Sequence, residues 1–236
     1  MVLKAVVFDG AGTLWKLTGF VYDGEKVAMF QEETLADFTK MDKVALVNVE
    51  EDLHVVYYRG FDGKEEVLKK LIKASLSLED VSPILDKYLR GEDVCTSIVL
   101  NGEKTICWLR LRASLYPEAK DAVKELRNLG IDIFIASGNC EKLCLKLAQD
   151  LSVPAMFVKP NASPEGKQDF VKLLDGFYGV VFMVGDNEND ALAFEAADVS
   201  ILVDRTSKRR ARKDLIENVD YVVNNLREVV DIVKEF

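Results

Sequence analysis

Short apolar runs alternate with amphipathic stretches through the second half of the chain. The apolar runs are 131–137 (IDIFIAS), 155–159 (AMFVK), 179–186 (GVVFMVGD), 198–203 (DVSILV) and 221–223 (YVV). Apolar residues at helical spacing occur at 117–130, 139–151, 163–176, 187–197, 207–218 and 224–236. This alternation predicts a parallel sheet with helices on both faces. Because the runs are continuously apolar, we expect strands that are buried on both sides.

The residues between about 19 and 110 have a different pattern. Strands and hairpins are indicated at 20–30, 43–51, 54–60 and 96–111, with a turn signal (NGEK) inside the last of these. Two helical patterns lie between them, at 63–76 and 78–91. We therefore predict an α/β core formed by 1–18 and 111–236, interrupted by an inserted α+β domain at 19–110. The strand at 3–9 belongs with the later core.

Composition and length are typical of a soluble globular protein. The chain has 236 residues, of which 49% are apolar and 30% charged. We find no apolar run of 18 residues and no signal peptide, so we expect a cytoplasmic protein without a membrane partner. The four cysteines form no CxxC pair. We expect them to be reduced, with Cys140 and Cys144 buried on one helix face.

The charge pattern argues against nucleic acid as a partner. The formal net charge is −9, and the basic run at 207–213 is best interpreted as the solvated face of a helix. The single histidine, His54, lies in an alternating strand pattern. A histidine metal cluster is therefore excluded, and His54 has no recognisable partner motif for a Ser-His-Asp triad. An anionic substrate would have to be held by local donors.

Carboxylates and a lysine are placed where parallel strands and helices end or begin. Asp9 ends the first strand, Asp186 ends the strand at 179–186, and Asp190 follows one helical turn later. Ligands of open α/β sheets bind at the carboxyl ends of strands. Asp9 is a candidate nucleophile, because a positioned carboxylate can form an aspartyl phosphate. Asp9 and Asp186 can share Mg²⁺. Lys167 would offset the negative charge, and Asp190 would orient Lys167 or a metal-bound water.

Small and hydroxyl residues complete this candidate site. Ser137 ends the strand at 131–137, and Gly138 follows at the expected start of a helix. Their hydroxyl and amide groups can donate to phosphoryl oxygens. Gly10 and Gly12 let backbone amides approach the phosphoryl group, and Thr13 would brace the turn after Asp9.

Four segments together resemble the motifs of the haloacid dehalogenase-like superfamily. They are 8–15 (FDGAGTLW), 135–139 (IASGN), Lys167 and 183–201 (MVGDNENDALAFEAADVSI). The last is similar to the GDGxND signature of P-type ATPases. The whole arrangement resembles soluble archaeal proteins related to the phosphorylation domain of those ATPases.

The resemblance implies a Rossmann-like three-layer core, an inserted cap domain and a phosphoenzyme on Asp9. It implies Mg²⁺ held by Asp9, the Ala11 carbonyl and Asp186, and a small phosphorylated molecule as substrate. Within the matched motifs, the residues expected to contact the substrate are Gly10, Ala11, Gly12, Thr13, Gly138, Asn139 and Asn189. Either of two lysines could serve. Lys159 matches the KP form of many phosphatases and Lys167 the P-E-x-K form of P-type ATPases, and the ATPase-like last motif favours Lys167.

The sequence departs from typical superfamily phosphatases at Ala11. The usual residue there is a second aspartate, which protonates the leaving group and then activates water. Alanine cannot move a proton, so we expect a preference for acyl phosphates, aryl phosphates or a nucleotide γ-phosphate, whose leaving groups need none. A weak ATPase activity fits this preference.

Two other functions stay open. One is a phosphonate hydrolase that forms a Schiff base with a lysine of the inserted domain, for which Lys64, Lys69, Lys70 and Lys73 are available. The other is a binding or regulatory module that is phosphorylated without turning over. The sequence determines neither the physiological substrate nor the oligomeric state.

Overall fold

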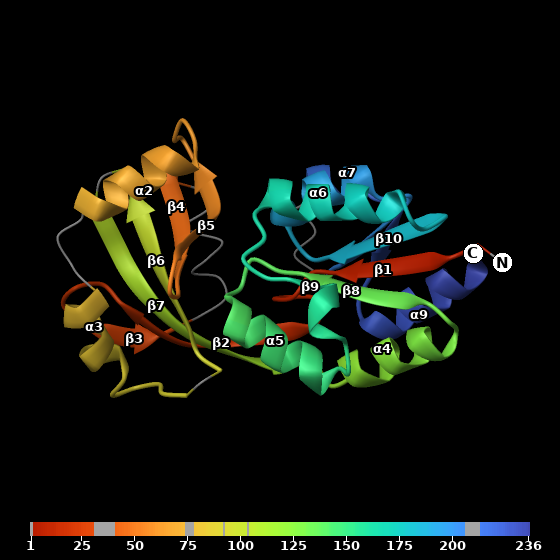
Figure 1. The fold of residues 1–236 in the computed structure, drawn as a ribbon, viewed down its shortest axis with the longest axis horizontal. Coiled ribbons are helices and arrows are strands. Elements are labelled where there is room, and N and C mark those ends of the chain that lie inside the picture. The colour runs from red at the N-terminus through yellow and green to blue at the C-terminus, as the bar shows by residue number, and fades with distance from the viewer. Residues whose placement is uncertain (1, 31–40, 74–77, 92, 103, 206–212) are drawn as a thin grey trace. The chain divides into compact units, whose positions relative to one another are not determined.

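A computed structural model describes residues 2–30, 41–73, 78–91, 93–102, 104–205 and 213–236. It forms two compact units (Figure 1). The first unit consists of Met1–Lys16, Leu115–Gly138 and Cys144–Phe236. The second consists of Leu17–Ser114 and Asn139–Leu143. Most of the basic run at 207–213 lies outside the described residues, so the prediction made for it has no structural counterpart.

The first unit is built on a six-stranded sheet. Its strands are β1 (Lys4–Phe8), β8 (Asp132–Ala136), β9 (Val158–Lys159), β10 (Val180–Gly185), β11 (Val199–Val203) and β12 (Tyr221–Val223). Their order is β12-β11-β10-β1-β8-β9, and every pair is parallel. Strand β1 lies inside the sheet. The next two strands in the chain, β8 and β9, lie on one side of it, and the last three, β10, β11 and β12, lie on the other side. The order therefore reverses between β1 and β10, which is where ligands bind in Rossmann-like sheets.

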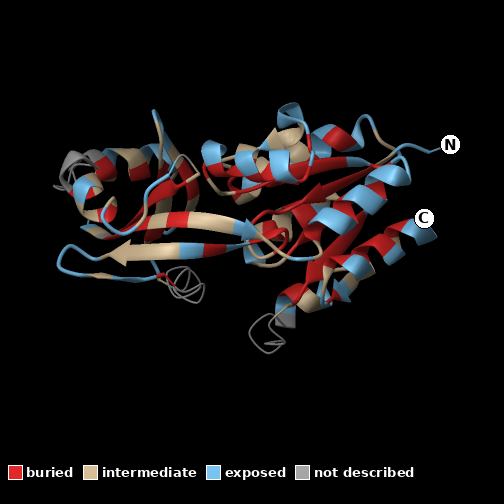
Figure 2. Cartoon of the chain, turned by 90° about the horizontal axis from the view of Figure 1, so that it is seen from below, coloured by how far each residue is buried: buried red, intermediate tan, exposed pale blue. Residues whose placement is uncertain are grey.

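Helices cover both faces of this sheet, as predicted (Figure 1). The helical segments are α4 (Ala119–Asn128), α5 (Glu141–Asp150), η1 (Ala155–Phe157), α6 (Pro164–Asp175), η2 (Glu188–Asp190), α7 (Ala191–Ala196), α8 (Lys213–Glu217) and α9 (Leu226–Glu235). On one face, α6 and α7 pack on β10 and β11 and share a buried apolar cluster that includes Val171, Met183 and Phe194. On the other face, α4 and α9 pack together. Figure 2 shows that the strands between these layers are buried.

Two predicted boundaries in this unit are wrong. The run at 155–159 was expected to be a strand, but Ala155–Phe157 form the 3₁₀ turn η1 and only Val158–Lys159 pair with β8. Pro154 has no amide hydrogen to donate to a ladder, and β9 lies at the sheet edge, where it has one neighbour. The helix expected from Pro117 begins two residues later, at Ala119.

The described residues of the second unit form a six-stranded sheet, with helices packed on it. The strands are β2 (Trp15–Tyr22), β3 (Val27–Met29), β4 (Val44–Val49), β5 (Leu53–Arg59), β6 (Cys95–Asn101) and β7 (Lys104–Leu115), in the order β3-β2-β7-β6-β4-β5. The pairs β2–β3, β4–β5, β4–β6 and β6–β7 are antiparallel. Helices α2 (Lys64–Lys73) and α3 (Leu78–Leu85) share a buried cluster with the sheet. The predicted fold class, a parallel α/β core with an α+β unit inserted in its sequence, is confirmed.

Smaller predictions about single residues agree with the structure, with one exception. His54 lies in strand β5. Cys140 and Cys144 are both buried, as are Cys95 and Cys107, but only Cys144 lies in α5, because the helix begins at Glu141. None of the described helices is both long enough and apolar enough to span a bilayer.

Candidate active site

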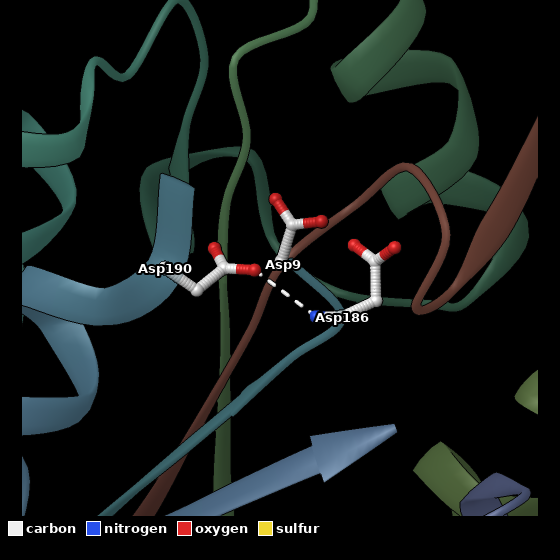
Figure 3. Close-up of side chains that lie close together, drawn as sticks. All are labelled: Asp9, Asp186 and Asp190. Atoms are coloured by element: carbon white, nitrogen blue, oxygen red, sulfur yellow. Dashed lines mark hydrogen bonds between the residues drawn. The ribbon is translucent and has the colours of Figure 1, made fainter. Parts of the chain in front are cut away.

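Asp9 and Asp186 lie side by side at the point where the strand order reverses. Strand β1 ends at Phe8, and the amide of Asp9 continues the ladder by donating to the Val184 carbonyl of β10 (2.8 Å). Asp186 follows the end of β10. The two carboxylates point to the same side of the sheet rim, and the carboxylate of Asp190 points toward them (Figure 3). The prediction that strand ends bring these acidic residues together is confirmed.

Lys167 contacts Asp9 from the first turn of α6. Ser163 caps this helix by accepting a hydrogen bond from the Gly166 amide, and Pro164 occupies the first helical position. This start places Lys167 on the buried side of the first turn. Its Nζ donates to Asp9 Oδ1 (2.6 Å) and to Asp190 Oδ1 (2.7 Å), and all three side chains are buried. Lys159, the other candidate, is exposed in β9.

Asp190 is held by backbone donors as well as by Lys167. Its Oδ2 accepts hydrogen bonds from the amides of Asp186 (3.0 Å) and Asn187 (3.3 Å). Asn187 caps the turn η2 and donates from Nδ2 to Asp186 Oδ1 (2.8 Å). Sequence reasoning missed Asn187 as a residue that orients Asp186, although an asparagine followed three residues later by an aspartate is a capping signal.

The electrostatics of this cluster follow from its burial. Burial raises the pKa of Asp9 to about 7, and Asp190 also raises it, while Lys167 lowers it. Burial acts to lower the pKa of Lys167, but the carboxylates of Asp190 and Asp9 outweigh it and hold that pKa above its ordinary value. The amine is therefore protonated at neutral pH. A divalent cation beside Asp9 would favour the ionised carboxylate.

Two glycines allow the loop after Asp9 to pass close to its neighbours. Gly12 has φ +88°, and a Cβ there would lie 2.2 Å from Asp186 Oδ2. A Cβ on Gly10 would lie 2.1 Å from the Trp15 ring and 2.5 Å from Ser137 Oγ. Because only glycine fits at both positions, the loop can lie against Asp186 and Ser137 at once.

The other predicted residues are placed as follows. Ser137 is buried directly after β8, and Gly138 is half-buried behind it, but α5 begins only at Glu141. Gly138 is therefore ahead of the helix rather than in its first turn. Asn139 falls in the second unit. Asn189 is half-buried in η2, where its amide donates to Asn187 Oδ1.

Backbone groups, rather than a hydroxyl, brace the turn after Asp9. The amides of Thr13, Leu14 and Trp15 all donate to the Gly10 carbonyl. The hydroxyl of Thr13 is buried and has no hydrogen-bond partner among the described residues. The Thr13 carbonyl accepts a hydrogen bond from Arg205, a residue that sequence reasoning missed because nothing in the pattern marks it.

The acidic residues fit a hard cation. Asp9, Asp186 and Asp190 offer carboxylate oxygens that lie within 4.8 Å of one another. Oxygen ligands of this kind suit Mg²⁺. Both oxygens of Asp190 are already engaged, one by Lys167 and the other by two backbone amides. Asp9 and Asp186 are therefore better suited to hold the ion than Asp190.

Comparisons with known proteins agree with this geometry. The family model of haloacid dehalogenase-like hydrolases matches residues 3–198. A soluble P-type ATPase-like phosphatase of Methanocaldococcus jannaschii is 25% identical, over 98% of this chain and 93% of its own length.

Two solved structures have the same fold. A phosphoserine phosphatase, solved as a phospho-aspartyl intermediate analogue, matches with a TM-score of 0.55 and 16% identity over 98% of this chain and 99% of its own. A zinc-transporting PIB-type ATPase in its E2.Pi state matches with a TM-score of 0.54 and 18% identity over 99% of this chain. The chain covers 41% of that transporter. Since the family model covers most of the sequence, the protein belongs to the haloacid dehalogenase-like hydrolases.

Proposed function

We propose that this hydrolase is a Mg²⁺-dependent phosphatase that forms an aspartyl phosphate on Asp9. The observation that carries the proposal is the buried contact of Asp9 with Lys167, beside Asp186, at the switch point of the sheet. A carboxylate held in this way can act as a nucleophile. The name of the M. jannaschii relative, a soluble P-type ATPase-like phosphatase, supports phosphate transfer as the reaction.

In the first step, an oxygen of Asp9 attacks phosphorus. The bond from phosphorus to the leaving group breaks, and the leaving oxygen takes the electron pair. In the second step, water attacks the same phosphorus and the bond between phosphorus and the Asp9 oxygen breaks. Inorganic phosphate departs with one proton of the water, the other proton passes to solvent, and the Asp9 carboxylate is restored. Lys167 balances the charge that builds up on the phosphoryl oxygens, because its protonated amine is already fixed beside Asp9.

The remaining site residues bind and orient the phosphoryl group. We assign the Ser137 hydroxyl and the Gly138 amide to its oxygens. Asp190 fixes the Lys167 amine. We place the residues of the loop after Asp9 in contact with the substrate, together with two asparagines: Gly10, Ala11, Gly12, Thr13, Asn139 and Asn189.

Asp9, Asp186 and the Ala11 carbonyl would hold the Mg²⁺ ion. The ion would supply positive charge at the transferring phosphoryl group. Asn187 keeps one oxygen of Asp186 oriented through its side-chain amide. Gly12 lies against the same carboxylate, so the loop and Asp186 are positioned together.

Replacing Gly12 with alanine is expected to weaken Mg²⁺ binding about tenfold, because the new Cβ would displace the Asp186 carboxylate. The left-handed backbone would also cost about 1–2 kcal/mol of stability. Calorimetric titration with MgCl₂ and urea unfolding measure the two effects. Gly130→Ala is the matched control, since Gly130 has φ +78° and no atom within 4 Å of an added Cβ. Equal Mg²⁺ affinity in the two variants would contradict the assignment of Asp186.

Ala11 sets the expected choice of substrate. With no carboxylate at this position, no side chain there can protonate a departing alkoxide. General acid catalysis is worth about 10²–10⁴-fold, so substrates whose leaving groups need no proton should be favoured. These are aryl phosphates, acyl phosphates and nucleotide γ-phosphates.

The test compares kcat/KM for p-nitrophenyl phosphate, acetyl phosphate, ATP and glucose 6-phosphate in the presence of Mg²⁺. We expect the sugar phosphate to be slower than the aryl phosphate by about 10²-fold or more. Ala11→Asp should speed phosphoenzyme hydrolysis and narrow this difference. Equal or faster turnover of the sugar phosphate by the natural protein, or no gain from Ala11→Asp, would refute the missing-acid explanation.

Ala11 also favours a second candidate function, a regulatory module that stays phosphorylated. Without a group to activate water, the second step could be slower than any physiological need. A burst of one leaving group per protein molecule, followed by no further release, would identify such a module. Continuous release at constant rate would identify the phosphatase.

The second unit is proposed to act as the cap that selects the substrate. In this proposal the domains are 1–18 with 111–236 as the catalytic core and 19–110 as the cap. The substrate is a small phosphorylated molecule rather than nucleic acid, since the chain carries a net charge of −9.

A further inference from the structure

Arg205 donates hydrogen bonds to the loop that follows Asp9. It lies two residues beyond the end of strand β11, and its side chain is mostly buried. Nε donates to the Gly12 carbonyl (3.2 Å) and Nη2 donates to the Thr13 carbonyl (3.0 Å). One guanidinium group therefore binds two consecutive carbonyls of the loop. It comes from the segment after β11, and β10 separates β11 from β1 in the sheet.

Two neighbours fix the guanidinium group itself. Nη1 donates to Glu118 Oε1 (2.6 Å), and the guanidinium carbon lies 3.7 Å from the centre of the Tyr116 ring. The three donor nitrogens thus point to three different acceptors, while the flat group stacks on an aromatic face. Arginine has donors in a rigid planar fork, which lysine lacks. The arrangement therefore specifies arginine rather than a positive charge alone.

The two carbonyls that Arg205 binds belong to Gly12 and Thr13, the residues directly after Ala11. The orientation of one peptide plane limits that of the next, so holding the carbonyls of Gly12 and Thr13 restricts the Ala11 carbonyl as well. Gly12 also lies against the Asp186 carboxylate. Three amides of the loop donate to the Gly10 carbonyl, and the Gly12 amide, which shares a peptide unit with the Ala11 carbonyl, donates to the Trp15 carbonyl (2.8 Å). These bonds close the turn without holding the carbonyls of Gly12 and Thr13.

We propose that Arg205 is a positioning residue, which holds the Ala11–Thr13 segment so that Asp9, the Ala11 carbonyl and Asp186 can share one Mg²⁺ ion. This inference rests on the proposed function. Arg205 acts through the loop, since its side chain contacts Gly12, Thr13, Glu118 and Tyr116. Its effect should therefore appear in Mg²⁺ affinity before it appears in the chemical step.

The experiment is calorimetric titration of the full chain with MgCl₂. Arg205→Lys keeps the positive charge but loses the planar set of guanidinium donors. It should raise the Kd for Mg²⁺ about tenfold, as expected for a residue that orients metal ligands. Turnover of p-nitrophenyl phosphate at saturating Mg²⁺ should stay within about threefold of the natural protein, because the reacting groups are unchanged. Glu118→Gln, which weakens one anchor of the guanidinium group, should raise the Kd in the same direction by a smaller factor.

Two controls make the outcomes decisive. Arg227→Lys changes an arginine that lines the same surface pocket as Arg205 and Glu118, and it should leave the Kd unchanged. Asp186→Asn removes a proposed ligand and should abolish calorimetric binding. In one outcome, Asp186→Asn fails to bind Mg²⁺ while Arg205→Lys and Glu118→Gln bind it with the affinity of the natural protein. This result would overturn the role of Arg205 and leave the metal site standing, even if the thermal stability of the Arg205 variant fell. Equal binding by the natural protein and Asp186→Asn would overturn the metal site, and the Arg205 inference with it.

Discussion

Replacing Asp9 with asparagine is expected to abolish steady-state turnover of p-nitrophenyl phosphate, with a loss on the order of 10⁶-fold. Asparagine keeps the shape and can still accept the hydrogen bond from Lys167, but its amide cannot form the aspartyl phosphate. The acid-quenched variant should also carry no hydroxylamine-sensitive ³²P after incubation with a labelled substrate. The natural protein should carry this label, because hydroxylamine cleaves acyl phosphates.

Folding should not account for that loss. Burial raises the pKa of Asp9 to about 7 in the metal-free protein, so the neutral and ionised forms are nearly balanced at neutral pH. In the unfolded chain this carboxyl has its ordinary, lower pKa, so its ionisation opposes folding at neutral pH, and a neutral asparagine is expected to leave the free energy of unfolding unchanged or to raise it. Urea unfolding at pH 7 checks this. Retention of a tenth of the natural activity by a folded Asp9→Asn variant would rule out Asp9 as the nucleophile.

Replacing Lys167 with methionine is expected to reduce both activity and stability. The loss of a fixed positive charge beside the transferring phosphoryl group should lower kcat by about 10²–10³-fold. The same change leaves the buried carboxylates of Asp9 and Asp190 without their cation. Removing one partner of a buried ion pair costs about 3–5 kcal/mol. We expect the lower end of that range, because Asp9 can take up a proton. Steady-state kinetics and urea unfolding of the metal-free protein measure these two losses.

Two further variants separate this account from a general loss of packing. Lys159→Met changes the exposed lysine of β9 and should alter the free energy of unfolding by less than about 0.5 kcal/mol. Lys167→Met combined with Asp190→Asn should be less destabilised than the sum of the single variants, because one unpaired charge is gone. Unfolding of Lys167→Met at the same urea concentration as the natural protein would contradict the buried ion-pair account.

The sheet could be predicted in some detail from sequence because its strands are buried on both sides. Runs such as 131–137 and 179–186 are continuously apolar, and helical patterns separate them. The run at 155–159 is also mostly apolar, yet only its last two residues pair with β8. An edge strand has one neighbour to define it, so composition alone does not determine how much of it joins the ladder.

The acidic rim of the site was also determined by sequence alone. Asp9 and Asp186 each follow a buried strand, and parallel strands end at one edge of a sheet. Any fold that pairs these strands in parallel brings the two carboxylates to that edge. The absence of a second aspartate at Ala11 is likewise a property of the sequence, and so is the expected preference for good leaving groups.

Only the tertiary structure decided which side chains support that rim. Lys159 and Lys167 both matched known motifs, and it is the packing of α6 that brings Lys167 Nζ to Asp9. Asp190 turned out to be saturated by Lys167 and two amides, which separates it from the metal-binding pair. Arg205 carries no local signal, since it reaches Gly12 from 193 residues away in the chain. Contacts of this kind depend on how elements that are distant in the sequence pack together. The pattern of apolar and polar residues in one segment therefore cannot predict them.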